Sequence, residues 1–133
     1  MDENLLYNVL IIASIIGIIA VTIIIFTNKT SEPFTELYFE DHQNLPKIVQ
    51  LNQIYNFQFS IHNLENKDEN YFYLIHIDAD GNDIFLDSSY ISLKNNQTAT
   101  ISKNFMLTEN FENAKIIVEL IGKNQEIHFW VKQ

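Results

Sequence analysis

Two patterns of hydrophobic and polar positions divide this chain. Residues 5–26 read LLYNVLIIASIIGIIAVTIIIF, an apolar stretch without a charged residue. About 22 residues in a helix, each rising ~1.5 Å, are long enough to cross a hydrocarbon core of about 30 Å. In lipid the backbone groups need partners within the segment, so it must be helical despite its many isoleucines. The pattern predicts a transmembrane helix over residues 5–26, preceded by a tail of residues 1–4.

The flanks of this stretch differ from those of a cleaved signal peptide, which has a basic start, a shorter apolar core and a small-residue cleavage site. Here Asp2 and Glu3 precede the stretch, and Phe26 is followed by threonine and asparagine. We therefore expect the helix to remain attached as an anchor. Residues 27–33 are predicted to form a polar linker, and residues 34–133 a single domain of about 100 residues.

Apolar and polar residues alternate with a period of two through most of this domain, as in half-buried strands. The alternation is clearest from Tyr55 to His62, where Tyr55, Phe57, Phe59 and Ile61 share one face. The same reasoning predicts strands at 34–39, 47–51, 53–63, 71–78, 84–86, 90–93, 97–106, 114–121 and 126–132. Seven to nine short strands without a helical period predict a mainly β chain, an immunoglobulin-like β-sandwich behind one N-terminal transmembrane helix.

The composition narrows the range of functions. Seventeen acidic residues against eight basic ones give a net charge of −9, which argues against a nucleic-acid partner. Without cysteine, disulfides, thiolate metal sites and cysteine nucleophiles are excluded. Neither the histidines nor the serines stand at a spacing typical of metal or nucleophilic sites: His42, His62, His76, His128, Ser88 and Ser89. We expect no enzyme and no cofactor.

Residues 78–83, DADGND, carry closely spaced carboxylates that could hold a calcium ion. The segment departs from the EF-hand loop, because its glycine stands at the fourth position and Ser89 occupies the twelfth. A tight hairpin turn at Asp80-Gly81 is the favoured interpretation, with a cation site as the alternative.

Three predicted strands, 71–78, 114–121 and 126–132, are apolar on both faces. If Tyr71 and Tyr73 face the core, Phe72 faces outward; the opposite parity would expose the tyrosines instead. In an immunoglobulin-like topology these strands share one sheet, whose outer face would expose a large apolar patch. The candidate partner-binding residues are Phe72, Leu74, Ile117, Ile121 and Trp130. Shielding by loops or by lysine side chains, and contact with the bilayer, are the alternatives.

Within the transmembrane segment Ala13, Gly17 and Ala20 form a stripe of small residues, a candidate surface for packing against another helix. The favoured interpretation is a helix without a partner, in which Ser14 and Thr22 bond to the backbone of their own helix.

The orientation of the anchor depends on weak signals that disagree. Lys29 after the helix favours a cytoplasmic domain. Two glycosylation sequons, at Asn28 and Asn96, have meaning only outside the cytoplasm, and Asn96 is the candidate site. We expect the domain to be extracytoplasmic.

Three aromatic segments, FTELY at residues 34–38, FSIHNLE at 59–65 and IHFWV at 127–131, follow a membrane span in this order. In this arrangement the chain resembles the uncharacterised archaeal membrane-associated DUF1616 family. The resemblance implies an archaeal, surface-exposed β-sandwich and no activity that could be carried over.

Together these features predict a single-pass, non-catalytic protein of the cell membrane. Its partners would be the lipid bilayer and other membrane protein subunits, to which it would serve as an accessory or structural subunit. The alternative is a stand-alone cell-surface module that binds or adheres to glycans or ions.

Overall fold

The computed structural model describes residues 3–27 and 32–133, which form two separate compact units. The first unit contains the helix α1 (Glu3–Thr27). Within the described residues, α1 is the one helix with the length and apolar composition to cross a membrane. It extends beyond the predicted 5–26 by two residues at the start and one at the end. Residues 1–2 of the expected tail and residues 28–31 of the expected linker lie outside the described residues.

Polar side chains in α1 hydrogen-bond to their own helix. The Ser14 and Thr22 hydroxyls each donate to the backbone carbonyl four residues earlier, at 2.8 Å. Such internal bonds satisfy a hydroxyl without a second helix. Ser14 and Thr22 therefore do not require hydrogen-bond partners from a second helix.

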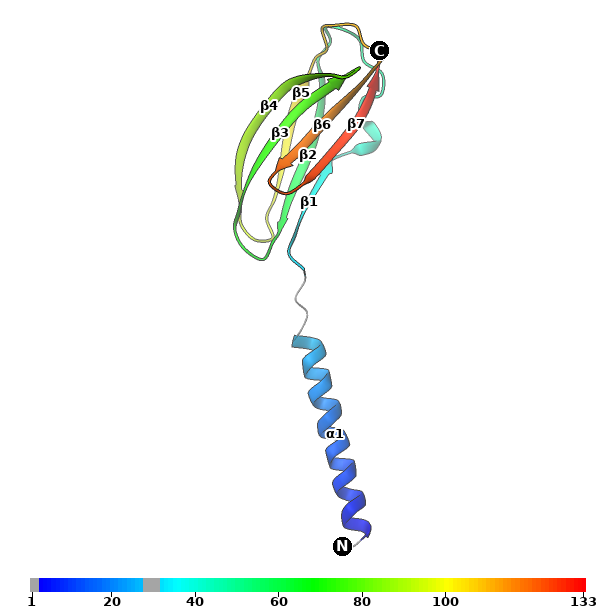
Figure 1. Cartoon of the computed structure of the whole chain (residues 1–133), viewed down its shortest axis with the longest axis vertical. Helices are drawn as coiled ribbons and strands as arrows, with labels where there is room; N and C mark the ends of the chain where they lie inside the picture. Colours follow the sequence, from blue (N-terminus) through cyan, green and yellow to red (C-terminus); the bar gives the residue numbers. More distant parts are fainter. Residues whose placement is uncertain (1–2, 28–31) are drawn as a thin grey trace. The chain divides into compact units, whose positions relative to one another are not determined.

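The second unit is a sandwich of two antiparallel sheets (Figure 1). One sheet has the strand order β1-β2-β5 and the other has the order β4-β3-β6-β7. The elements are β1 (Phe34–Phe39), the short 3-10 helix η1 (His42–Asn44), β2 (Tyr55–Leu64), β3 (Glu69–Ala79), β4 (Asn82–Leu93), β5 (Thr98–Phe105), β6 (Asn113–Ile121) and β7 (Gln125–Lys132). The predicted fold class, a mainly β immunoglobulin-like sandwich with an N-terminal apolar helix, is confirmed.

Two strand predictions were wrong. The segment 47–51 makes a single parallel bridge, between Ile48 and Lys132, because the chain turns at Asn52, whose φ is 59°. The segments 84–86 and 90–93 belong to one strand, β4, because the polar residues between them pair with β3. Polar residues are tolerated there since β4 is the edge of its sheet.

Aromatic side chains fill the space between the sheets. Phe57 and Phe59 from β2 are fully buried, as the alternation of β2 predicts. The Phe57 ring lies 5.6 Å from that of Phe129 on β7, and the Phe59 ring lies 5.4 Å from that of Tyr73 on β3, both edge to face. Such rings contribute large buried areas and favourable geometry. The sheets are therefore held together by aromatic contacts rather than by a disulfide.

A polar network holds the first strand of the sandwich. The buried Thr35 hydroxyl donates to Glu65 Oε1 at 2.6 Å, and Lys123 Nζ donates to the same oxygen at 2.9 Å. The Tyr71 hydroxyl lies 3.0 Å from Thr35 Oγ1. The hydrogen bond from Thr35, together with that from Lys123, lowers the pKa of Glu65 below its ordinary value of 4.5.

Glu65→Gln tests this network through pH. A carboxylate whose pKa is lower in the folded than in the unfolded state adds stability above the unfolded pKa, and that stability is lost as the pH falls through the folded value. We expect Glu65→Gln to unfold at a lower temperature than wild type at pH 7, with the difference shrinking below about pH 4 and vanishing once the pH lies below the lowered pKa of the folded state. Thermal unfolding followed by near-ultraviolet circular dichroism measures this. Glu126→Gln, at an exposed position, is the control. If Glu65→Gln lowered the unfolding temperature by the same amount at pH 7 and at acidic pH, the prediction would be contradicted.

Candidate functional site

The face of the sheet β4-β3-β6-β7 that points away from the core is the candidate site, and it is called the outer face below. Residues of β3 alternate strictly, with Tyr71, Tyr73, Ile75 and Ile77 buried in the core. Phe72, Leu74 and His76 therefore lie on the outer face. β6 and β7 lie beside β3 in the same sheet, as the sequence predicted. The register places Ile117 and Ile121 of β6, and Trp130 of β7, on this face as well.

The five candidate residues differ in how much surface they offer. Trp130 is 56% exposed and Ile121 is 43% exposed. Phe72 and Leu74 are half-buried. Ile117 is 5% exposed, because it lies on the central strand β6 between His76 and His128. Ile117 thus supports its neighbours and offers little area to a partner.

Two exposed aromatic residues of the outer face, Phe85 and Tyr90, were missed by the sequence reasoning. They stand five positions apart in β4, so regular alternation would place them on opposite faces. A β-bulge restores them to the same face: Asp87 pairs with Ile75 and Phe85 pairs with His76, which leaves Leu86 as the extra residue. Tyr90 is 76% exposed and Phe85 is 65% exposed.

The apolar residues of the outer face form two clusters. The tyrosine cluster consists of Tyr90, Phe72 and Ile121, neighbours across three strands, and the Phe72 and Tyr90 rings stack at 4.5 Å between centroids. The tryptophan cluster comprises Phe85, His76, Ile117, His128 and Trp130. Between the clusters lies a more polar row, which consists of Ser88, Leu74, Glu119 and Glu126.

Charged and polar groups surround Trp130. The Lys115 ammonium lies 5.7 Å from the centre of its indole ring, and the His128 ring meets it edge to face at 6.2 Å. His76 Nδ1 is 2.5 Å from Asp83 Oδ1. An exposed indole with a cation over its face has both an apolar surface and polar neighbours, the combination typical of protein interfaces.

Metal binding finds no support on this face. His76 and His128 lie in one sheet but are separated by Ile117. Across residues 3–27 and 32–133, no three side chains of histidine, aspartate or glutamate are grouped as metal ligands.

The acidic segment 78–83 forms the hairpin turn between β3 and β4. Asp80 and Gly81 have φ values of 50° and 87°, the left-handed conformation of this turn. The Asp80 carboxylate accepts the backbone N–H groups of Glu112 and Asn113, at 2.7 and 3.0 Å, and these bonds lower its pKa. The Gly81 N–H donates to Asp78 Oδ1 at 2.9 Å. The Asp78 carboxylate thus shapes the turn, and the Asp80 carboxylate connects the turn to the start of β6.

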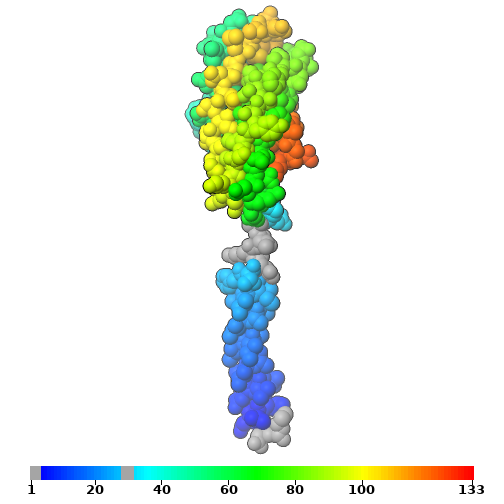
Figure 2. Space-filling view, turned by 90° about the vertical axis from the view of Figure 1, so that its left-hand side faces the viewer, coloured from blue at the N-terminus to red at the C-terminus, as the bar shows by residue number. Residues whose placement is uncertain are grey.

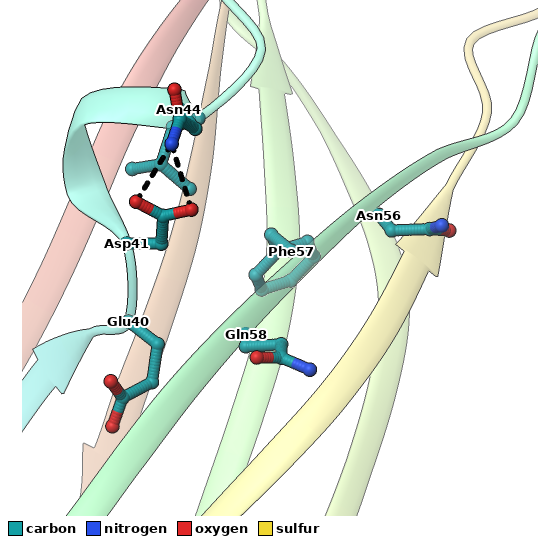
Figure 3. Close-up of a pocket in the computed structure, with 7 residues that line it drawn as sticks. Glu40, Asp41, Asn44, Asn56, Phe57 and Gln58 are labelled. Carbon is teal, nitrogen blue, oxygen red and sulfur yellow. Dashed lines mark hydrogen bonds between the residues drawn. The ribbon is translucent and has the colours of Figure 1, made fainter.

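A second surface feature is a cavity of about 210 Å³ between η1 and β2. Figure 3 shows Asp41 and Asn44 on one side of it and Asn56, Phe57 and Gln58 of β2 on the other. Asn44 Nδ2 donates to both Asp41 carboxylate oxygens at 2.9 Å, which closes the 3-10 turn. These polar groups satisfy one another, so their arrangement serves the turn.

The remaining candidate residues lie on α1 and in a turn of the sandwich. Ala13, Gly17 and Ala20 are exposed on α1, and a Cβ added at Gly17 would have no neighbour within 4 Å. Asn96 is exposed in the turn between β4 and β5, with a φ of 63°, and its Oδ1 lies 3.3 Å from His62 Nε2. Helix packing and glycosylation stay predictions.

Solved structures with the same fold belong to proteins of different kinds. The CARDB domain of a Pyrococcus furiosus protein, solved in complex with di-metal ions, has a TM-score of 0.61 and 14% identity, over 79% of this chain and 96% of that one. A β-glucosidase from Listeria innocua has a TM-score of 0.62 and 12% identity over 75% of this chain, which spans only 16% of the enzyme. The DNA glycosylase AlkC of Pseudomonas fluorescens, bound to DNA with an abasic site analog, scores 0.56 at 13% identity, over 77% and 31% of the two chains.

Identities of 12 to 14% show a shared fold and nothing finer. By fold, the chain is an immunoglobulin-like β-sandwich with an N-terminal apolar helix. No protein-family model matches the sequence, so the resemblance to DUF1616 stays a prediction. No curated protein matches it either.

Proposed function

We propose that this protein is a non-catalytic, single-pass anchor of the cell membrane whose sandwich lies outside the cytoplasm. Its outer face docks onto another membrane protein, to which it serves as an accessory or structural subunit. The observation that carries the proposal is the gathering of exposed Phe85, Tyr90 and Trp130 on one face of one sheet.

The chemistry of this face favours a protein as the partner. Aromatic residues are enriched at the centres of protein interfaces, where a few of them supply most of the binding energy. Asp83 and Lys115 lie at the end of the sheet beside the tryptophan cluster, and Glu119 and Glu126 lie in the row between the clusters, so charges of both signs accompany the apolar residues. Several large apolar groups on one face are uncommon in a domain without a partner.

The absence of cysteine permits one experiment that tests orientation and docking together. Lys132→Cys places a single thiol on the outer face beside Trp130, and Ile54→Cys places one at an exposed position outside β2. Both variants of the full chain are labelled on intact native cells with a membrane-impermeant maleimide that carries a photocrosslinker. We expect both thiols to be labelled, and a defined membrane protein to be crosslinked from position 132 but not from position 54.

Trp130→Ala in the Lys132→Cys background is the matched test of the interface. Loss of an aromatic residue at the centre of an interface costs about 2 kcal/mol or more, so the adduct should fall sharply. Absence of labelling at both thiols would overturn the extracytoplasmic orientation. Labelling without a distinct adduct from position 132, or an adduct that is a glycan, would overturn protein docking, and the glycan adduct would favour the surface-module alternative.

A further inference from the structure

A cavity of about 260 Å³ lies at one end of the sandwich, and its wall includes Ile84, the residue before Phe85 of the tryptophan cluster. Its walls come from the turn and the start of β4, residues 79–84, and from the loop between β5 and β6, residues 106–110. Both segments lie at the top of the sandwich in Figure 2. Pockets for drug-sized ligands begin at about 300 Å³, so this cavity has the size for one long side chain.

The walls combine apolar and acidic groups. Ile84 and Met106 line the cavity and are 41% and 45% exposed, while Leu107 beside them is buried in the core. Exposed aliphatic and thioether groups at the mouth of a cavity offer contact to an alkyl chain. Asp80 and Glu109 line the same cavity.

The two charged residues that line the cavity, Asp80 and Glu109, are both acidic. Segments 78–83 and 106–113 contain Asp78, Asp80, Asp83, Glu109 and Glu112 and no basic residue. Asp80 is held in its ionised form by the two backbone N–H groups that it accepts. Within the described part of the chain Glu109 makes no ion pair, so its carboxylate remains available to a cation from outside.

From these features we propose that the cavity binds the side chain of a lysine or arginine presented by another polypeptide. The alkyl stem lies along Ile84 and Met106, and the cationic head reaches the Glu109 carboxylate. The negative charge of Asp80, in the same cavity, also attracts the cation. Long basic side chains bury their stems while keeping their heads near charge or water. A neutral apolar ligand would leave the carboxylates unpaired, and an anion would be repelled by them. This site goes beyond the docking of the outer face and does not depend on it.

Methyl NMR of the full chain in nanodiscs of zwitterionic lipid tests the proposal. Met106 is one of only two methionines, so its methyl signal is readily assigned, and Ile84 gives a second probe on the same wall. The probes are N-acetyl-arginine methylamide and its citrulline analogue, which has the same length and no charge. We expect saturable shifts of both methyl signals with the arginine compound and none with the citrulline compound.

Two matched charge variants complete the design. Glu109→Gln removes the carboxylate of the cavity, and Glu126→Gln removes an exposed carboxylate of the outer face. Glu109→Gln should weaken arginine binding about fivefold, the effect of one partly exposed ion pair, and Glu126→Gln should leave it unchanged. Equal shifts with citrulline, shifts that do not saturate, or equal weakening by both variants would overturn the proposal.

Discussion

Phe59→Ala is expected to lower the free energy of unfolding of the sandwich by about 3 to 5 kcal/mol. Phe59 is 0% exposed, and its ring lies between the sheets, against Tyr73 and near Phe57. Alanine loses both the transfer free energy of the ring and the contacts of the cavity that remains. Because domains of this size have about 5 to 15 kcal/mol of stability in total, the variant should be close to unfolding at physiological temperature.

Guanidinium unfolding of the full chain in detergent micelles, followed by near-ultraviolet circular dichroism, measures this loss. Phe34→Ala is the matched control, since Phe34 is half-exposed at the start of β1 and should cost less than about 1 kcal/mol. A loss for Phe59→Ala no larger than that of the control would show that the aromatic core does not hold the sheets together.

Asn63→Ala should cost about 2 to 4 kcal/mol, which is large for a polar residue. The Asn63 side chain is fully buried and hydrogen-bonded at both ends. Its Nδ2 donates to the carbonyls of Lys67 and Leu93, at 2.8 and 3.0 Å, and its Oδ1 accepts the Glu65 N–H at 3.0 Å. Alanine would leave these backbone groups without that partner and would disconnect the β2–β3 loop from the end of β4.

Hydrogen exchange gives this prediction a local readout besides the unfolding curve. The Glu65 amide should exchange much faster in Asn63→Ala than in wild type, while amides of β6 should follow global stability alone. Asn104→Ala, on the exposed face of β5, is the control and should be neutral. Unchanged protection at Glu65 would contradict the role assigned to Asn63.

Local patterns in the sequence were sufficient to predict much of this fold. The apolar run of α1 predicted a helix, and the alternation from Tyr55 to Ile61 predicted which face of β2 is buried. The placement of Phe72 and Trp130 in one sheet followed from the sandwich topology. These features depend on side-chain period and chain order, which a single sequence contains.

Features that depend on pairing between distant segments were not predictable in this way. The bulge at Leu86 exists only relative to the register of β3, so the exposure of Phe85 and Tyr90 on one face was missed. Burial of Ile117 depends on its place on a central strand, between β3 and β7. The cavity beside Met106 is formed by two loops about 25 positions apart, and no local pattern indicates it.

The bulge in β4 also bears on how this domain avoids aggregation. β4 is a free edge of 12 residues, and an edge of that length with exposed aromatic residues is a template for intermolecular sheet growth. Leu86 interrupts its regular register, and Asp87 forms an ion pair with Lys103 of β5, the strand that lies beside β4 in Figure 2. Inward-pointing charges and bulges both discourage another chain from adding as a further strand. The same extra residue that gathers the aromatic side chains on one face therefore helps to keep neighbouring copies from polymerising through their edges.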